Sequence, residues 1–359
     1  MNAPNAALES FLKSIPLFSL VEPADMMDLL RLLRPVQLEA GQVLFREGQG
    51  GAAMWVLGKD AEVSISATPK DGKRPVVIAY CKRGDTVGEM ALIEDSKRSA
   101  TAVVTQAGLA HEISAVEFQT LRQAWSPAAF KILRRMCIEL CAKLRASSER
   151  VAPSSPAKIE TPGLPVGPHA SLDDIEAFPA LKTLPSVVKL ALTQKVRVVT
   201  TDDIQPIFAE GEKADAAYFL VSGEVNIGRG GKTLTTMGPG SMFGIVAAID
   251  GGARSASAIT NGPVRMLRLA DADFDSLFAT GNRFAFHLVD LVARQLVDHI
   301  RNVNQLMRVP GTGSRPAVVS PTVAPAAAPA PSPKTSDIDA LALELELELS
   351  PEMPDDLLA

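Results

Sequence analysis

Two side chains of opposite charge, Glu89 and Arg98, lie nine residues apart in the stretch VGEMALIEDSKRSATA (residues 87–102). A carboxylate accepts hydrogen bonds from sugar hydroxyls, and a guanidinium presents a fork of N–H donors that suits a phosphate. The small residues Ser99 and Ala100 let backbone N–H groups approach such a phosphate closely. The pattern matches a ligand with a 2′-hydroxyl beside a singly charged phosphate. Taken alone, a Glu and an Arg at this spacing more often form a surface salt bridge.

The stretch that carries this pair has a second copy further along the chain. FGIVAAIDGGARSASA (243–258) aligns with residues 87–102 without a gap at an offset of 156. Upstream, VLFREGQGGAAMWVL (43–57) resembles PIFAEGEKADAAYFLV (206–221) at an offset of 163. The difference of seven residues indicates an insertion in the first copy, and the polar, turn-rich segment ATPKDGKRP (67–75) is its expected place. An internal repeat of this kind predicts two domains of one fold.

The two copies differ at the carboxylate. The second copy has Ile245 where the first has Glu89. A sugar hydroxyl buried against an apolar side chain stays unpaired, which costs about 1–3 kcal/mol, or roughly ten- to a hundredfold in affinity. We therefore expect the second site to be degenerate. The residues that it keeps are Gly244, Arg254, Ser255 and Ala256, the counterparts of Gly88, Arg98, Ser99 and Ala100.

Each copy consists of short β-branched or alternating segments between glycine-containing turns, as in AEVSI, PVVIAY, YFLVSGEVNI and VRMLRL. This pattern is typical of an antiparallel barrel or sandwich. A helical region follows each copy, at residues 116–148 and 272–308, and its apolar residues recur at spacings of three and four. Such an apolar seam along one face of a helix either packs back on the barrel or pairs with another helix as a coiled coil. A helix-mediated homodimer is therefore one expectation.

Composition divides the chain into five expected segments. They are a first domain (1–150), a Pro-rich linker (151–169), a second domain (170–308), a Pro/Ala linker (309–336) and an acidic Leu/Glu tail (337–359). The linkers should be extended and poorly ordered because they are rich in Pro, Ala and Ser.

The charge is concentrated at the C-terminal end. The last 24 residues hold eight of the 41 acidic side chains and no Lys or Arg, so the rest of the chain is close to neutral. No basic stripe of the kind that clamps DNA is visible. No apolar run is long enough to span a membrane and no secretion signal is present, which together with three cysteines predicts a cytoplasmic protein.

Cys137 and Cys141 lie four residues apart, where a metal could bridge them, but no second Cys or His pair accompanies them. We expect both to pack in a core and expect no metal site and no cofactor.

The tail DALALELELELSPEMPDDLLA alternates leucine with glutamate or alanine from residue 341 to residue 349. A period of two places the leucines on one face of a strand, which could add to the sheet edge of a protein partner. A solvated, disordered acidic tail is the equally weighted alternative.

The stretch GEMALIEDSKRSATA resembles the phosphate-binding cassette of cyclic nucleotide-binding domains, the family of the catabolite activator protein and the regulatory subunits of cAMP-dependent kinase. LEAGQVLFREGQ and IPLFSLVEPADMMDLLRLL resemble the first strand, turn and entry helices of that family. The resemblance covers residues 9–148 and, more loosely, 171–308. It implies a mainly β fold of two tandem eight-stranded jelly-roll barrels, each followed by a helix. The sequence departs from the family at Val87, where an aromatic is usual, and at Ala61, near which a hairpin glycine is usual.

By this resemblance Glu89 takes the ribose 2′-hydroxyl and Arg98 the cyclic phosphate. Ser99 favours cAMP, with cGMP as the alternative, and the helix after the barrel supplies base contacts that cannot be assigned. The second pocket is expected to bind a cyclic nucleotide weakly, to bind a different anion or, as favoured here, to be empty and structural. The first ligand site comprises Gly88, Glu89, Met90, Ala91, Arg98, Ser99 and Ala100, and the second, degenerate one Gly244, Ile245, Arg254, Ser255 and Ala256.

The sequence thus predicts a cyclic nucleotide sensor or regulatory adaptor that signals through protein contacts and has no catalytic motif. No helix-turn-helix or basic face follows the second copy, so DNA binding is not expected. A ligand-free scaffold is the alternative, and a transcription regulator of the catabolite activator family is the third hypothesis.

Overall fold

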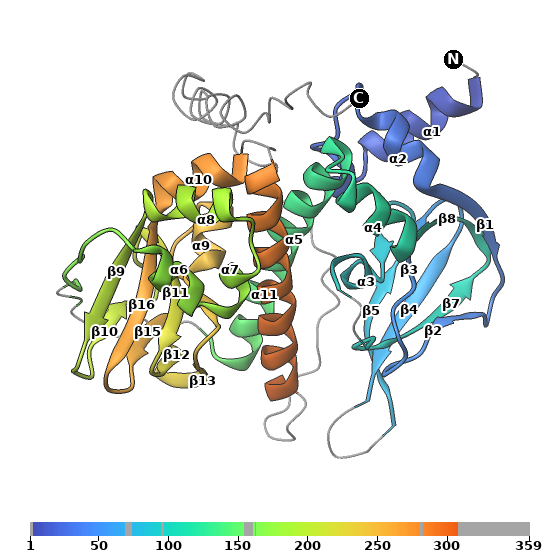
Figure 1. Ribbon diagram of the computed structural model, residues 1–359. Coiled ribbons are helices and arrows are strands. Elements are labelled where there is room, and N and C mark those ends of the chain that lie inside the picture. The colour runs from blue at the N-terminus through green and yellow to red at the C-terminus, as the bar shows by residue number, and fades with distance from the viewer. Residues whose placement is uncertain are drawn as a thin grey trace, which may run out of the picture. The chain divides into compact units, whose positions relative to one another are not determined.

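The computed structural model describes residues 3–68, 74–94, 97–153, 161, 163–279 and 283–307 (Figure 1). All of them belong to one compact unit of the chain. Most of the expected insertion tip at 67–75, the linker 309–336 and the tail 337–359 lie outside the described residues, so the expectations about them stay untested.

Eight antiparallel strands form the first barrel as two four-stranded sheets, ordered β1-β8-β3-β6 and β2-β7-β4-β5. The strands are β1 (Leu33–Leu38), β2 (Val43–Phe45), β3 (Ala53–Leu57), β4 (Glu62–Ala67), β5 (Val76–Cys81), β6 (Thr86–Val87), β7 (Thr101–Gln106) and β8 (Gly108–Ser114).

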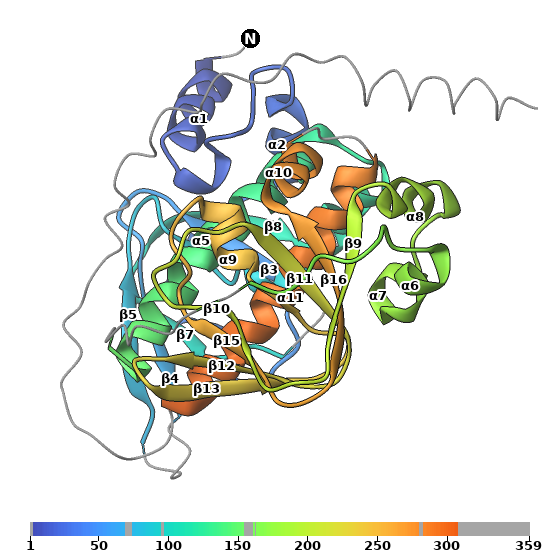
Figure 2. The ribbon, with the colours of Figure 1, turned by 90° about the vertical axis from the view of Figure 1, so that its left-hand side faces the viewer.

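The second barrel repeats this topology strand by strand, with sheets ordered β9-β16-β11-β14 and β10-β15-β12-β13 (Figure 2). Its strands are β9 (Val196–Thr201), β10 (Pro206–Phe208), β11 (Ala216–Ser222), β12 (Val225–Arg229), β13 (Lys232–Met237), β14 (Met242–Phe243), β15 (Ser257–Thr260) and β16 (Val264–Ala270). The expectation of two tandem eight-stranded, mainly β barrels with flanking helices is confirmed.

Each barrel has its own apolar interior. In the first, Phe45 and Trp55 stack with ring centroids 5.9 Å apart, and in the second Tyr218 and Phe243 stack at 5.2 Å. Aromatic pairs of this kind bury large areas on the inward faces of alternating strands.

A left-handed residue sits at the turn that follows β3, and it is not Ala61. Asp60 has a φ of +63°, and its counterpart in the second copy is Gly223, with a φ of +85°. Asp tolerates this conformation better than most residues, which is how the first copy keeps the turn without a glycine.

The helices precede or follow the barrels, with two short ones inside the cassettes. They are α1 (Ala3–Lys13), η1 (Pro16–Phe18), α2 (Met26–Leu32), α3 (Met90–Ile93), α4 (Ala115–Gln123), α5 (Pro127–Val151), α6 (Leu172–Ala177), α7 (Pro179–Lys182), α8 (Ser186–Thr193), α9 (Ile245–Asp250), α10 (Asp271–Ala279) and α11 (Arg283–Met307). No helix among the described residues combines the length and apolarity needed to cross a bilayer.

The helical region expected at 116–148 is two helices rather than one. Trp125 adopts a left-handed φ of +56°, and Pro127 occupies the first turn of α5. Proline fits a first turn but cannot continue a helix from the preceding residues, because its ring removes an N–H donor and clashes with the turn before it.

The apolar seams of α5 and α11 pack on each other within one chain (Figures 1 and 2). Phe130 and Phe286 lie with ring centroids 5.8 Å apart, and the Cys137 Sγ is 3.9 Å from the carbonyl oxygen of Val289. Cys137 and Cys141 are both fully buried in this core. A homodimer through these helices stays a prediction, and the seams on which it was based are already paired intramolecularly.

Candidate ligand sites in the two barrels

A glycine with positive φ opens the cassette of the first barrel between β6 and α3. Gly88 has a φ of +89°, and a Cβ added there would lie 2.5 Å from Nη1 of Arg98. Only glycine therefore lets the arginine approach this turn. In the second barrel Gly244 plays the same part, with a φ of +75° and an added Cβ 2.7 Å from Nη1 of Arg254.

The two sequence motifs that recur in each copy meet at this arginine. The N–H of Gly48 donates to the carbonyl of Arg98 over 2.9 Å, and the N–H of Gly211 donates to that of Arg254 over 2.9 Å. The turn after the second strand of each barrel thus holds the backbone of the cassette arginine in place.

Arg98 is a buried guanidinium with donor capacity left over. Its Nη1 donates to the carbonyl of Gly88 over 3.0 Å and its Nη2 to the carbonyl of Ala53, and its Cζ lies 4.1 Å from the ring centroid of Phe45. Its Nε is buried and has no hydrogen-bond partner among the residues that the structure describes. Burial lowers the pKa of Arg98, which Glu89 opposes. An unpaired buried donor on a cation is a site at which an anion is stabilised.

Glu89 is not free in this structure, because Lys143 of α5 pairs with its carboxylate. The Glu89 side chain is 12% exposed and that of Lys143 is 48% exposed. Burial tends to raise the pKa of Glu89, but the charge and hydrogen bond of Lys143 outweigh it and hold that pKa below its ordinary value. The group expected to accept a sugar hydroxyl is therefore occupied by a cation from the helix that follows the barrel.

Arg254 repeats the contacts of Arg98 and adds one. Its Nη1 donates to the carbonyl of Gly244 over 2.9 Å, its Nη2 to that of Ala216 over 2.8 Å, and its Cζ lies 4.1 Å from the Phe208 ring centroid. Its Nη2 also meets Oδ1 of Asp215 at 2.6 Å.

The acid beside Arg254 has no counterpart in the first copy, where the position of Asp215 is Ala52. Ile245, at the place of the first cassette's carboxylate, is fully buried.

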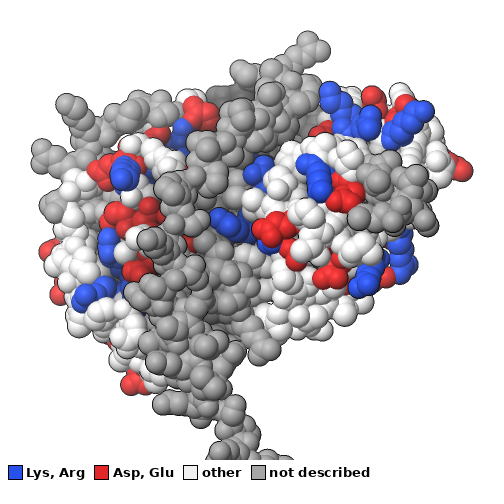
Figure 3. Space-filling view, turned by 90° about the horizontal axis from the view of Figure 1, so that it is seen from above, with Lys and Arg blue, Asp and Glu red and all other residues white. Residues whose placement is uncertain are grey.

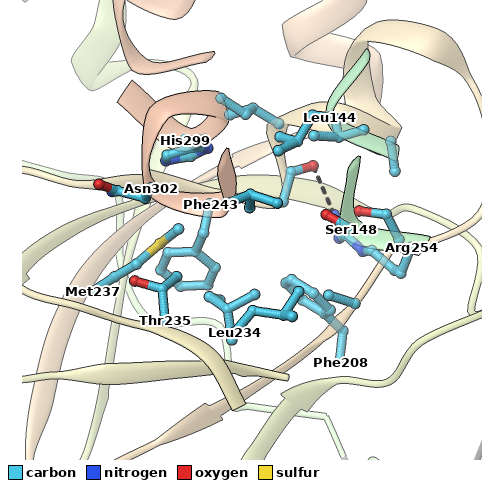
Figure 4. A pocket seen from close by; sticks show the side chains of 18 residues that line it. Leu144, Ser148, Phe208, Leu234, Thr235, Met237, Phe243, Arg254, His299 and Asn302 are labelled. Atoms are coloured by element: carbon cyan, nitrogen blue, oxygen red, sulfur yellow. Dashed lines mark hydrogen bonds between the residues drawn. The ribbon is translucent and has the colours of Figure 1, made fainter. Parts of the chain in front are cut away.

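A cavity of about 70 Å³ lies in the second barrel against its cassette (Figure 4). Figure 4 shows Arg254 and Phe208 on one side of it, Leu234 below, and His299 and Leu144 above. Leu144 comes from α5, so the helix after the first barrel forms part of the second barrel's cavity wall.

Each cassette is also held by the helix that follows the other barrel. From α5, Arg145 makes two bonds to Asp250 at the end of α9, at 2.6 and 2.8 Å. From α11, Arg301 pairs with Glu94, which follows α3. Since α5 also carries Lys143, one helix contacts both sites.

The chain matches the cyclic nucleotide-binding domain family at residues 35–124 and 201–280, one match in each barrel. The protein carries two cyclic nucleotide-binding domains in tandem.

Individual relatives resemble parts of this tandem chain. The CRP-like cAMP-activated global transcriptional regulator of Mycobacterium tuberculosis (strain H37Rv) is 34% identical over 128 residues, which is 34% of this chain and 57% of the regulator. The Cyclic AMP receptor protein of Thermus thermophilus is 36% identical over 117 residues, covering 31% of this chain and 54% of that protein. The chain thus spans little more than half the length of these relatives. A solved structure of cAMP-bound PfPKA-R (141–441) is 19% identical with a TM-score of 0.32, covering 86% of this chain and 93% of that one.

In the first cyclic nucleotide-binding domain the predicted residues gather around one turn. Glu89 occupies the N-cap position of α3, which begins with Met90 and Ala91, and Arg98 donates to the carbonyl of Gly88 in the same turn. Ser99 and Ala100 follow on the way into β7. In the second domain Ile245 begins α9, while Arg254, Ser255 and Ala256 line the cavity beside Gly244. Their roles toward a ligand stay predictions.

Sequence reasoning missed Lys143, Arg145 and Asp215. No local signal identifies them, because each is a charged residue in an ordinary segment whose partner lies 54, 105 or 39 residues away.

Proposed function

We propose that the protein is a cyclic nucleotide sensor whose ligand, cAMP by preference, binds in the first domain. The observation that carries this proposal is the pair of a carboxylate, Glu89, and a buried guanidinium with a free Nε, Arg98, on the two sides of one cassette turn. Two of the relatives are named for cAMP, and Ser99 was the residue that favoured cAMP in the sequence.

Binding in this proposal exchanges one partner of Glu89 for another. The ribose 2′-hydroxyl donates to the carboxylate in place of Lys143, and the cyclic phosphate takes the unused donors of Arg98. Lys143 then leaves the cassette and α5 is released at that end. Arg145 on the same helix is hydrogen-bonded to Asp250 at the end of α9. A movement of α5 therefore also displaces or strains the second cassette.

Calorimetric titration of the full chain with cAMP and cGMP tests the proposal. Arg98→Lys, which loses the fork geometry, should weaken cAMP binding by about ten- to a hundredfold, whereas Arg254→Lys in the second domain is the matched control and should not. On the unaltered protein, 2′-deoxy-cAMP should bind about ten- to a hundredfold more weakly than cAMP, because Glu89 loses its donor.

The two outcomes that defeat the proposal point to different alternatives. The absence of heat with either nucleotide would refute the sensor and favour the ligand-free scaffold. Equal losses from Arg98→Lys and Arg254→Lys would move the site away from the first domain.

The output of the sensor is proposed to be a protein contact in the cytoplasm, with the acidic tail at 337–359 as the candidate surface. Transcription regulation is the second candidate function, because the Mycobacterium tuberculosis relative is a transcriptional regulator. On the described part of the face in Figure 3, basic and acidic side chains are interspersed, which does not favour a DNA-binding stripe there. A gel shift with salt-sensitive DNA binding would favour the regulator.

A further inference from the structure

The cavity of the second domain combines an apolar wall with one buried cation. We propose that it binds a small amphipathic monoanion, a molecule with a single anionic group on an apolar body and no hydroxyl next to that group. This inference is independent of the nucleotide proposed for the first domain, since it concerns other residues.

The space suits a small apolar body. The cavity of about 70 Å³ is several times the roughly 10–15 Å³ that one buried water requires. Its wall includes the rings of Phe208 and Phe243 and the side chains of Leu234, Met237 and Ile245. A mainly apolar cavity with a few placed polar groups is the common form of a small-molecule site.

One cation faces this space. Among the described residues that line the cavity, Arg254 is the only one whose side chain carries a permanent charge, and it is 2% exposed. Three of its five N–H groups bond to Gly244, Ala216 and Asp215, and its Nε is buried with no partner among the described residues. A buried donor of this kind is satisfied by an anionic oxygen.

Asp215 does not cancel the charge of Arg254, because it is shared. Arg268 also meets this carboxylate, at 3.0 Å, so two guanidinium groups face one acid. Asp215 alone therefore does not neutralise both arginines, and burial raises the pKa of Asp271, the other acid near Arg254.

The remaining polar groups of the wall are neutral. Burial lowers the pKa of His299 to about 4, so its ring is uncharged at neutral pH. Ser148, Thr235 and Asn302 offer hydroxyl and amide groups. A second negative charge on the ligand would therefore have no cationic partner, so we expect the ligand to carry a single negative charge.

Ile245 determines whether the cavity can accept a ligand that has a hydroxyl group next to its anionic group. In the first domain the carboxylate of Glu89 occupies this position, and here a fully buried hydrocarbon side chain replaces it. A ligand hydroxyl placed against Ile245 would be buried without an acceptor there and would lose about ten- to a hundredfold in affinity. The second cavity therefore selects against a ribose.

The test follows the methyl resonance of Met237, which lines the cavity, in the full chain labelled with ¹³C-methyl methionine. Met237→Leu assigns the signal. Benzoate is the probe, benzamide is its uncharged isostere, and inorganic phosphate is an anion without an apolar body. Benzoate should move the Met237 resonance saturably, benzamide should bind at least about tenfold more weakly, and phosphate should leave it unmoved.

Two neighbouring residues of β13 supply a matched pair of variants. Thr235 lines the cavity and is half-buried, whereas Thr236 is exposed on the other face of the strand. Thr235→Trp should fill the cavity and abolish the response to benzoate, and Thr236→Trp should keep it.

Four results would overturn the proposal. They are no saturable shift with benzoate, equal binding of benzoate and benzamide, equal effects of the two Trp substitutions, and tighter binding of cAMP than of benzoate at Met237. The last would make the cavity a nucleotide site, whatever the first domain binds.

Discussion

Replacing Lys143 by methionine isolates the competition between α5 and the ligand for Glu89. In the structure the carboxylate is already paired with Lys143, so a ribose hydroxyl must displace an ammonium group before it can bond. Lys143→Met keeps the length and the apolar stem of the side chain and removes the charge. We therefore expect two opposite effects, a less stable free protein and a tighter complex with cAMP.

The free energy of the Lys143–Glu89 ion pair can be estimated from the solvent exposure of its two side chains. Because the Lys143 side chain is 48% exposed, solvent screens the interaction, and about 0.5–1 kcal/mol is the appropriate value. This corresponds to a two- to fivefold lower dissociation constant for cAMP, at about 1.4 kcal/mol per tenfold change. The free protein should lose a similar free energy of unfolding, since Glu89 is left mostly buried without its partner.

The pair also has a defined pH dependence. The folded pKa of Glu89 lies below its ordinary value, so its stabilisation is present above the pKa of the unfolded chain and is lost as pH falls through the folded pKa. Urea unfolding of Lys143→Met should therefore show a smaller loss of stability on acidification than the unaltered protein.

Calorimetric titration with cAMP measures the affinity, and Lys131→Met is the control. Lys131 lies on the same helix and pairs with Asp25 and Glu22, away from the cassette, so its removal should lower stability without changing the affinity. Weaker cAMP binding by Lys143→Met, fivefold or more, would refute the reasoning, because it would mean that Lys143 contacts the ligand itself.

Two further predictions concern single residues. The half-buried His299 has a folded pKa of about 4 against about 6.5 when unfolded, so stability falls as pH drops from 6.5 to 4. His299→Gln should reduce this loss, measured by urea unfolding, by about 1–2 kcal/mol between pH 7 and pH 5, and the exposed His169→Gln should not. Asp60→Gly should stabilise the first domain by about 0.5–1 kcal/mol in the same assay, because Asp60 has a φ of +63° where the second copy has Gly223. Asp202→Gly, at an exposed bend that is not left-handed, should instead be neutral or destabilising.

The repeat in the sequence predicted two domains of one fold, and the resemblance to cyclic nucleotide-binding domains implied that each is an eight-stranded barrel. The offsets of 156 and 163 aligned two motifs of one copy with two of the other, and the structure has the same sheet order in both. Within a cassette the residues that contact each other are close in sequence, or are brought together by the barrel fold itself. The position of Arg98 under Gly88 was therefore predictable in outline, because the glycine and arginine occur together in both copies.

The contacts between copies were not predictable in the same way. Lys143 and Arg145 are two of many charged residues on α5, and their partners depend on how α5 and α11 pack across each other. A 3.6-residue period identifies the buried face of a helix but not the element that covers it. The apolar seam of α5 was compatible with a second chain, and in the structure the other half of the same chain covers it.

The two domains keep the same buried arginine and differ in what surrounds it. Around Arg98 the carboxylate is that of Glu89, which pairs with Lys143 in this structure. Around Arg254 the carboxylate is Asp215, which is not among the residues lining the cavity, whereas Ile245 is. In our two proposals, this change in the position of the acid distinguishes a site that binds a hydroxyl beside an anion from one that binds an anion beside hydrocarbon. Helix α5 contacts both sites, through Lys143 and Arg145. A ligand bound at either site would therefore change the contacts of this one helix.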